Sequence, residues 1–385
     1  MRSIELFAGA GGLALGVSRA GFSHEAVIEK DRNACGTIRE NVRRGIVNWP
    51  LRQTDIRVFD YSSIEEQIDL LAGGPPCQPF SIGGKHAGFR DDRDLFPEAA
   101  RAVRELKPKA FLFENVKGLL RSNFSKYFEY ILLRVSYPDV LRKPSEDWTE
   151  HLSRLERHHV QGRSDGLQYR VVFQLLNAAD YGVPQRRERV VIVGFRSDLD
   201  LEWSFPQATH SSDTLHRDKW ITGDYWDRHR IARKDRPLPP IHPRSARSGS
   251  FFPYDQKPWN TVRDAISDLP DPEKAVTSCL VLNHRLTPGA KSYQGHTGSP
   301  LDEPAKTLKA GDHGVPGGEN MLAHQDGRVR YFTVRESARL QTFPDDYGFH
   351  GSWTESMRQL GNAVPVALGQ VLASDIRARL EGKPG

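Results

Sequence analysis

The stretch Gly74-Pro75-Pro76-Cys77-Gln78-Pro79-Phe80 decides how we interpret the fold of this chain. It follows a short apolar run, residues 68–72, that is typical of a buried parallel strand. The prolines end this strand, because proline has no N–H to donate to a sheet. Cys77 is therefore predicted at the carboxyl end of a strand, where ligands bind in open α/β sheets. A free cysteine can equally be a small buried hydrophobic residue, so the rest of the chain must decide.

Length, charge and cysteine content narrow the class of protein. The 385 residues suffice for two domains with cores of their own. The net charge of +5 suits a polyanionic partner, although it is a weak signal alone. The three cysteines are far apart, which argues against a zinc site and a disulfide framework. The chain opens on a strand, and no apolar run reaches the roughly 18 residues of a membrane helix. We therefore expect a cytoplasmic protein without a metal ion.

A glycine-rich turn follows the first predicted strand. Residues 3–7 are predicted as a strand and residues 8–12, Ala-Gly-Ala-Gly-Gly, as a turn before a helix that ends at Gly21. Strand, turn and helix begin a nucleotide-binding βαβ unit, in which glycines let a ligand approach the helix N-terminus closely. The phosphate-binding spacing Gly-x-Gly-x-x-Gly is absent. Phe7, which comes directly before the turn, suits an adenine or a sulfonium ligand better than a pyrophosphate. The tight turn of an NAD enzyme remains an alternative.

Acidic residues follow the next two strands. The strand at 26–29 ends in Glu29, which can accept hydrogen bonds from both ribose hydroxyls of an adenosine cofactor. A solvated strand end is the alternative. Asp55 near the third strand can accept from an adenine amino group, with Ile56 against the ring.

A carboxylate and two arginines are predicted near Cys77. The apolar strand 110–113 is expected to lie centrally in the sheet and to deliver Glu114 to the edge that carries Cys77. A carboxylate at the end of a buried strand, beside a cysteine, is more typical of a catalytic site than of a packed core. The alternative is that Glu114 only stabilises the start of the next helical turn. Arg187 and Arg189 share one face of an extended segment and need acidic or base partners when buried. Surface salt bridges are the alternative.

Two regions depart from this strand and helix pattern. The polar stretch 143–165 is interpreted as an insertion at the domain edge. From about residue 198 prolines, rings and cations are interspersed, which favours a separate loop-rich domain with a DNA contact surface over a merely solvated face. The cations and rings of this surface are Trp220, Tyr225, Trp226, Arg228, Arg230, Arg233, Lys234, Arg236, Arg244 and Arg247.

The C-terminal part contains two further helix signals. Thr333 and Glu336 have the spacing of a capping box at the start of a helix. Residues 361–365, Gly-Asn-Ala-Val-Pro, are predicted to open the last helix and to direct N–H groups and the Asn362 amide at a ligand. A simple helix cap is the alternative.

Five segments, taken together and in this order, resemble the cytosine-C5 DNA methyltransferase family. They are Phe7-Ala8-Gly9-Ala10-Gly11, Pro75-Pro76-Cys77-Gln78, Glu114-Asn115-Val116, Gln185-x-Arg187-x-Arg189, and the Arg335 helix with Gly361-Asn362. The resemblance implies an α/β fold with a Rossmann-like methyltransferase domain, residues 1–197 plus 345–385. It also implies a smaller loop-rich target-recognition domain at 198–344, and a last helix that returns to the larger domain.

The resemblance further implies S-adenosylmethionine as the methyl donor and S-adenosylhomocysteine as its product, with no metal. By position, the residues similar to the family's donor-binding set are Phe7, Gly9, Gly11, Gly12, Glu29, Asp55, Ile56, Pro76, Leu95 and Asn362. Lys30 departs from the pattern, because relatives often have an aromatic residue there over the adenine.

The resemblance also implies a covalent mechanism on a cytosine flipped out of double-stranded DNA. Cys77 adds to C6, which turns C5 into a nucleophile toward the sulfonium methyl. Glu114 holds a proton against N3, while Arg187 and Arg189 bind O2 and the sugar-phosphate and orient Glu114. The loop 81–93 is expected to act as a lid over the flipped base.

We expect a monomeric, sequence-specific DNA methyltransferase of a restriction-modification system, with a possible cognate restriction endonuclease acting separately. A transfer-RNA cytosine-C5 methyltransferase and a non-catalytic DNA-binding homologue are the alternatives. An amino-methyltransferase is disfavoured, because Cys77 rather than an aromatic residue follows the two prolines.

Overall fold

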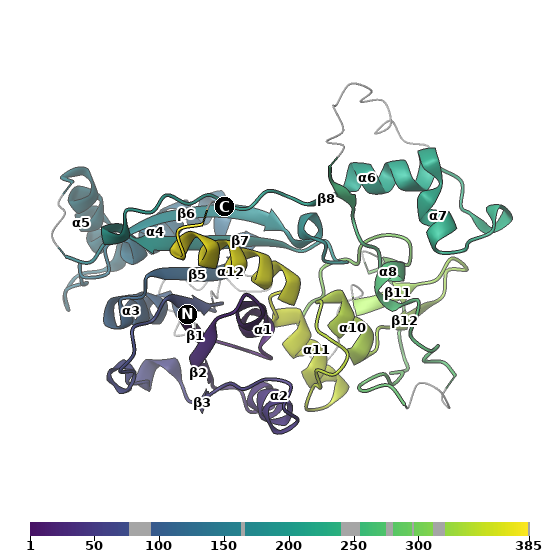
Figure 1. Ribbon diagram of the computed structural model, residues 1–385, viewed down its shortest axis with the longest axis horizontal. Helices are drawn as coiled ribbons and strands as arrows, with labels where there is room; N and C mark the ends of the chain where they lie inside the picture. Colours follow the sequence, from purple (N-terminus) through teal and green to yellow (C-terminus); the bar gives the residue numbers. More distant parts are fainter. Residues whose placement is uncertain are drawn as a thin grey trace.

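The computed structural model describes residues 1–76, 94–162, 166–239, 255–274, 280–294, 296–310 and 320–383. Cys77 and the predicted lid lie outside these residues, as do Arg244 and Arg247. The described residues form a large α/β unit around one sheet and a smaller group of elements beside it (Figure 1). None of the described helices combines the length and the apolar character that crossing a membrane requires.

A seven-stranded sheet in the order β3-β2-β1-β4-β5-β7-β6 forms the centre of the larger unit. The strands from β3 to β5 are parallel, whereas β7 is antiparallel to both β5 and β6. The bounds are β1 Arg2–Leu6, β2 Ser23–Glu29, β3 Leu51–Gln53, β4 Leu70–Gly73, β5 Ala110–Val116, β6 Tyr169–Asn177 and β7 Glu188–Arg196. The central position predicted for β5 is confirmed, since it lies between β4 and β7.

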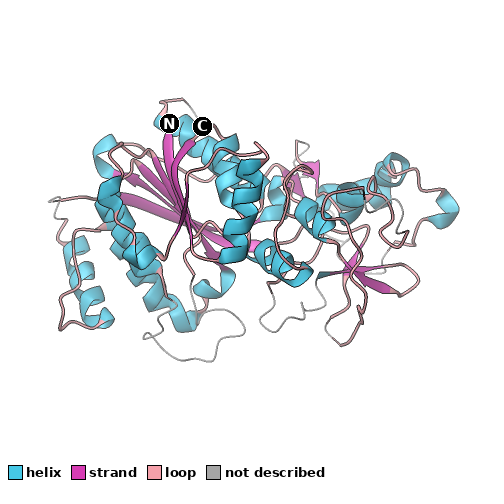
Figure 2. Cartoon of the chain, turned by 90° about the horizontal axis from the view of Figure 1, so that it is seen from below, coloured by secondary structure: helices cyan, strands magenta, loops and turns pink. Residues whose placement is uncertain are grey.

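Helices cover both faces of this sheet (Figure 2). Helices α1 (Gly12–Arg19) and α12 (Val366–Leu380) pack on the face that receives Leu70 and Ala72 of β4. Helices α3 (Phe96–Leu106) and α4 (Ser125–Ser136) cover the other face, which receives Leu71. This split follows from the alternation of side chains along a strand. The predicted return of the last helix to the larger unit is confirmed.

Two more helices border the larger unit. Asp31 caps α2 (Arg32–Arg43) by accepting hydrogen bonds from two backbone N–H groups of its first turn. Helix α5 (Trp148–Val160) lies in the stretch interpreted as an insertion, and its buried Leu152 and Leu155 join the core beneath α4. The insertion is therefore packed on the sheet unit through an apolar helix face.

The chain returns to the sheet through α10 (Val334–Leu340), α11 (Trp353–Asn362) and α12. The predicted capping box of Thr333 and Glu336 at the start of α10 is confirmed. The helix start predicted at Gly361-Asn362 is wrong, because these residues are the last two of α11. Helix α12 begins only after Pro365, which has no N–H to continue the hydrogen-bond ladder of α11.

The smaller group of elements has two small cores of its own. Its elements are β8 His210–Ser211, α6 Ser212–Arg217, a π-helical turn Asp218–Thr222, α7 Asp224–Arg228, β9 Lys257–Pro258, α8 Val262–Ile266, β10 Ser299–Pro300, β11 Met321–Ala323 and β12 Val329–Tyr331. One core joins α8 and β11 to Leu340, and the other joins α6 to Tyr225 and Trp226 of α7.

The second core corrects one part of the expected DNA surface at 220–236, namely that its rings are open to bases. Tyr225 and Trp226 are 0% and 2% exposed, so their faces are not open to stacking with bases. The charges are also not of one sign, because Arg228 pairs with Asp264 at 3.1 Å and Arg236 pairs with Asp227. Rings in a small domain must first supply its core, and they do so here.

Candidate active site

A cavity of about 470 Å³ opens at the carboxyl ends of the parallel strands. The predicted donor-binding residues that line it are Phe7, Gly9, Gly12, Glu29, Asp55, Ile56, Pro76, Leu95 and Asn362. Lys30 and Glu114 line it too. The cavity has the volume of a typical small-molecule site, and it lies where open α/β sheets bind their ligands.

The turn after β1 is shaped by residues with positive φ. Phe7 has φ 55°, which is rare for an aromatic residue and is a local strain at the cavity wall. Gly12 accepts no side chain, because a Cβ there would come within 2.3 Å of the Val364 carbonyl oxygen. The turn and the segment before α12 are thereby in direct backbone contact.

Gly11 is the one predicted donor-binding residue among the described ones that does not line the cavity. Its φ is 84°, and a Cβ would come within 2.5 Å of the Trp49 ring and 2.9 Å of the Tyr347 hydroxyl. Gly11 therefore permits packing behind the turn instead of contact with a ligand.

Glu29 is held in one orientation by backbone donors. Its Oε2 accepts from the N–H of Gly9 at 2.7 Å, and its Oε1 accepts from the N–H groups of Lys30 and Asp31 at 2.8 and 2.7 Å. Oε2 keeps a further lone pair for a ligand, whereas both lone pairs of Oε1 are used by the two backbone donors. Glu29 thus links the glycine turn to the end of β2 and presents a fixed acceptor to the cavity.

Asp55 lines the same cavity from the short connection that follows β3. The Arg57 guanidinium, which hydrogen-bonds Asp55 at 2.7 Å, holds the pKa of this carboxyl well below its usual range. Lys30 lies 3.6 Å from the same carboxylate. The position where relatives often have a ring is therefore occupied by a cation that pairs with Asp55.

Glu5 is a cavity residue that our sequence reasoning missed. It lies inside β1, is 1% exposed, lines the cavity, and its Oε2 has no hydrogen-bond partner. Burial raises the pKa of the Glu5 carboxyl well above its usual value of 4.5. The signal was present in the sequence, because Glu5 stands between the apolar residues Ile4 and Leu6 of the first strand.

The ends of β4 and β5 lie against each other, as predicted. The Asn115 side chain donates to the Pro75 carbonyl oxygen at 2.9 Å, and the Glu114 carboxylate lies above Gly74. Pro76 lines the cavity and immediately precedes Cys77. The described residues therefore bring the segment that leads to Cys77 beside Glu114.

Arg189 pairs with Glu114, whose Oε1 lies 2.6 Å from the Arg189 Nε. The two side chains are only 12% and 11% exposed, and the contact is an ion pair without the alignment of a hydrogen bond. Of the two arginines of this segment, Arg189 is the one that lies against Glu114. In the antiparallel register, Arg189 of β7 lies opposite Val116 of β5, and Glu114 is two residues from Val116 on the same face of β5. Arg189 and Glu114 therefore lie on one face of the sheet, within reach of each other.

Arg187 behaves differently from the expectation that it also faces the base and Glu114. It is 0% exposed and donates to the carbonyl oxygens of Leu308 and Gly361 at 3.1 and 2.8 Å. Burial, aided by neighbouring Arg189, lowers the pKa of Arg187 well below its usual range. Its Nη1 and Nη2 donate to backbone carbonyls next to the cavity residue Asn362, whereas its buried Nε has no hydrogen-bond partner.

Comparison with known proteins agrees with this geometry. The family model for C-5 cytosine-specific DNA methylase matches residues 1–136 and 154–378. The chain belongs to this family. Its reaction is the methylation of cytosine at C5 in DNA. The unmatched residues 137–153 overlap the stretch that we interpreted as an insertion.

Individual relatives cover nearly the whole chain. Type II methyltransferase M.PspPI of Psychrobacter sp. (strain TA137) is 34% identical over 99% of this chain and 80% of its own length. Type II methyltransferase M.Eco47II of Escherichia coli is 33% identical over 97% and 78%. A mutant of DNMT2 from Spodoptera frugiperda has a similar fold, with a TM-score of 0.58 and 17% identity over 98% of this chain and 99% of its own.

Proposed function

We propose that the chain binds S-adenosylmethionine in the cavity and methylates a cytosine within a specific sequence of double-stranded DNA. The single observation that carries the proposal is the Glu114–Arg189 pair beside the segment that leads to Cys77, at the rim of a cavity of donor size. A restriction-modification role, with a separately acting endonuclease, is proposed from the names of the Type II relatives.

The lining of the cavity fits the donor. Glu29 and Asp55 offer carboxylates to ribose hydroxyls and to an adenine amino group, and Phe7 and Ile56 offer apolar surface to the ring. Glu5 offers a buried oxygen without a partner, which suits the ammonium group of an amino acid. The donor, when bound, supplies an electrophilic sulfonium methyl group.

Cys77, Glu114 and Arg189 carry the proposed chemistry. The Cys77 thiolate forms a bond to C6 of the cytosine, and the electron pair released at C5 takes the methyl group. Glu114 holds a proton at N3 while this charge develops, and Arg189 orients Glu114 and binds O2. A water molecule then takes the C5 proton, and the C5–C6 double bond re-forms as the C6–S bond breaks and releases the Cys77 thiolate. Arg187 does not contact the base in this proposal. It holds the backbone of Gly361, directly before Asn362, through a hydrogen bond.

Residues 198–344 are proposed as the target-recognition domain of a monomeric enzyme. The target cytosine must leave the helix to reach the sheet edge, at a few kcal/mol of unstacking. A transfer-RNA substrate is the alternative, since the catalytic set alone does not distinguish the two nucleic acids. We place the enzyme in the cytoplasm, where its cysteines remain reduced.

The first experiment is methyl transfer from labelled S-adenosylmethionine to bacterial genomic DNA and, in parallel, to total transfer RNA. We expect 5-methylcytosine in DNA and none with Cys77→Ala. Label in transfer RNA alone would replace the DNA proposal by the alternative. Label in DNA that survives in Cys77→Ala would refute the covalent step.

A further inference from the structure

The loop between α10 and α11, residues 341–352, reaches the glycine turn of the donor cavity. Tyr347 in this loop is 0% exposed, and its Oη donates to the Ala10 carbonyl oxygen at 2.7 Å. Ala10 lies in the turn between β1 and α1, directly after the cavity residue Gly9. One hydroxyl group thus connects a residue near the end of the chain with the backbone of the donor turn.

The Tyr347 hydroxyl also lies against the next residue of the turn. Gly11 packs so closely on Tyr347 and Trp49 that a Cβ has no room. Neither Gly11 nor Tyr347 lines the cavity. Any influence of Tyr347 on a bound donor must therefore pass through the conformation of the turn, whose positive φ values need outside support.

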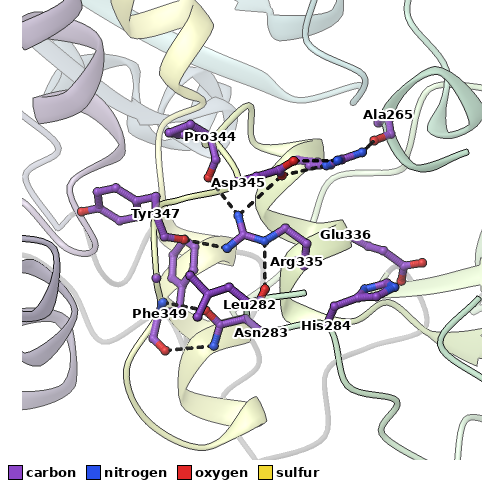
Figure 3. Close-up of polar contacts among 12 residues, drawn as sticks. Ala265, Leu282, Asn283, His284, Arg335, Glu336, Pro344, Asp345, Tyr347 and Phe349 are labelled. Atoms are coloured by element: carbon purple, nitrogen blue, oxygen red, sulfur yellow. Dashed lines mark hydrogen bonds and ion pairs between the residues drawn. The ribbon is translucent and has the colours of Figure 1, made fainter. Parts of the chain in front are cut away.

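Arg335 of α10 holds this loop in place (Figure 3). Its buried guanidinium donates to the carbonyl oxygens of Pro344 at 2.9 Å and Tyr347 at 2.7 Å, and to that of Leu282 at 3.0 Å. Burial lowers the pKa of Arg335 to about 10, but the group remains a cation at neutral pH. Three carbonyls from two separate segments therefore converge on one side chain.

Two asparagines clamp the same loop from different parts of the fold. Asn41 of α2 exchanges two hydrogen bonds with Gly348, of 2.8 and 2.9 Å. Asn283 exchanges two with Phe349, of 3.2 and 2.9 Å (Figure 3). Leu282 and Asn283 belong to the proposed recognition domain. The polar network therefore runs without a break from that domain to the glycine turn.

We propose that Tyr347 is a positioning residue for the donor pocket, and that Arg335 makes its support depend on the segment at Leu282-Asn283. Tyr347 holds the glycine turn in the conformation that binds the donor. The inference rests on the proposed function, because it takes the cavity as the S-adenosylmethionine site. It adds a residue that touches neither donor nor base.

The test is the affinity of the full chain for S-adenosylhomocysteine, measured by titration calorimetry in wild type, Tyr347→Phe and Tyr169→Phe. The control Tyr169 is also buried, and its Oη donates to the Pro108 carbonyl oxygen at 2.7 Å, away from the cavity lining. Both variants lose one buried hydrogen bond of the same kind. We expect Tyr347→Phe to raise the Kd about 3- to 10-fold and Tyr169→Phe to leave it unchanged.

Kinetics separate positioning from general damage. Tyr347→Phe should raise the KM for the donor by a similar factor and leave kcat and the affinity for DNA unchanged. Equal Kd values in all three proteins would overturn the inference while leaving the donor site intact, and so would an equal loss in both variants. A wild type that does not bind S-adenosylhomocysteine would instead refute the proposed function.

A second variant tests the support by Arg335. Arg335→Lys keeps the positive charge but cannot reach three carbonyls in a fork. We expect it to raise the Kd for S-adenosylhomocysteine at least as much as Tyr347→Phe. A folded Arg335→Lys protein with wild-type affinity would refute the part of the proposal that concerns the recognition segment.

Discussion

Acidic side chains have different numbers of hydrogen-bond partners in two regions of this molecule. At the sheet edge, Glu5 has an oxygen without a partner and Glu114 has one ion pair, and both face a cavity. In the smaller group of elements, Asp264 accepts from Thr261, Arg228 and His229 and is fully satisfied. Glu5 and Glu114 thus each have a buried oxygen without a hydrogen bond beside the cavity, whereas both oxygens of Asp264 accept hydrogen bonds.

The largest expected effect concerns the sheet edge. Cys77→Ala should lower turnover by more than about 10⁴-fold and retain DNA binding, because the covalent step is lost. The measurement is single-turnover methyl transfer on DNA with the target site.

The same nucleophile can be tested without mutation. DNA with 5-fluorocytosine at the target should trap a denaturation-resistant adduct, because fluorine cannot leave as a proton does. Cys35→Ala should still form the adduct, since burial raises the pKa of Cys35 to about 12 and keeps its thiol protonated. An adduct formed by Cys77→Ala would contradict the assignment.

Glu114→Gln is the next test of the sheet edge. We expect kcat to fall about 10²- to 10⁴-fold, because the amide cannot hold a transferable proton at N3. Glu188→Gln is the matched control, since Glu188 precedes Arg189 but pairs at the surface with Lys117 at 2.8 Å. Equal turnover in the two variants would remove Glu114 from the mechanism.

The aromatic core of the smaller region gives the converse prediction. Trp226→Ala should lower the free energy of unfolding of that region by about 3–5 kcal/mol, because a large buried side chain is removed. Urea unfolding followed by fluorescence measures this loss, with Leu238→Ala at an 88% exposed site as the control. Unchanged stability with weakened DNA binding would restore the stacking role that we had expected.

The smallest expected effect is the pH dependence that Glu5 gives to stability. Its folded-state pKa is raised, so the folded chain holds a proton that the unfolded chain releases above about pH 4.5. The contribution of Glu5 is therefore present below that pH and is lost as the pH rises. Glu5→Gln should gain stability relative to wild type between pH 5 and pH 8 in urea unfolding. A gain independent of pH would contradict the raised pKa.

The sheet and most of the cavity were predictable because their signals are local. Apolar runs ending in glycine, proline or an acid located the strands, and parallel strands bring such ends to one edge. Glu29, Asp55 and Glu114 were found in this way. Glu5 was missed because we searched strand ends and not strand interiors. The Gly361-Asn362 helix start was wrong because α11 continues through both residues and Pro365 separates it from α12.

Short stretches of the chain were enough to predict the order of strands and turns, the family and the types of side chain at the sheet edge. The folded chain was needed to show that Arg189 pairs with Glu114, that Tyr225 and Trp226 belong to a core, and that Tyr347 donates to Ala10. These contacts join segments that are far apart in the sequence, such as Tyr347 and Ala10, which are separated by 337 positions. Local sequence patterns do not predict such contacts, because the burial and the hydrogen-bond partners of a side chain depend on how the whole chain packs.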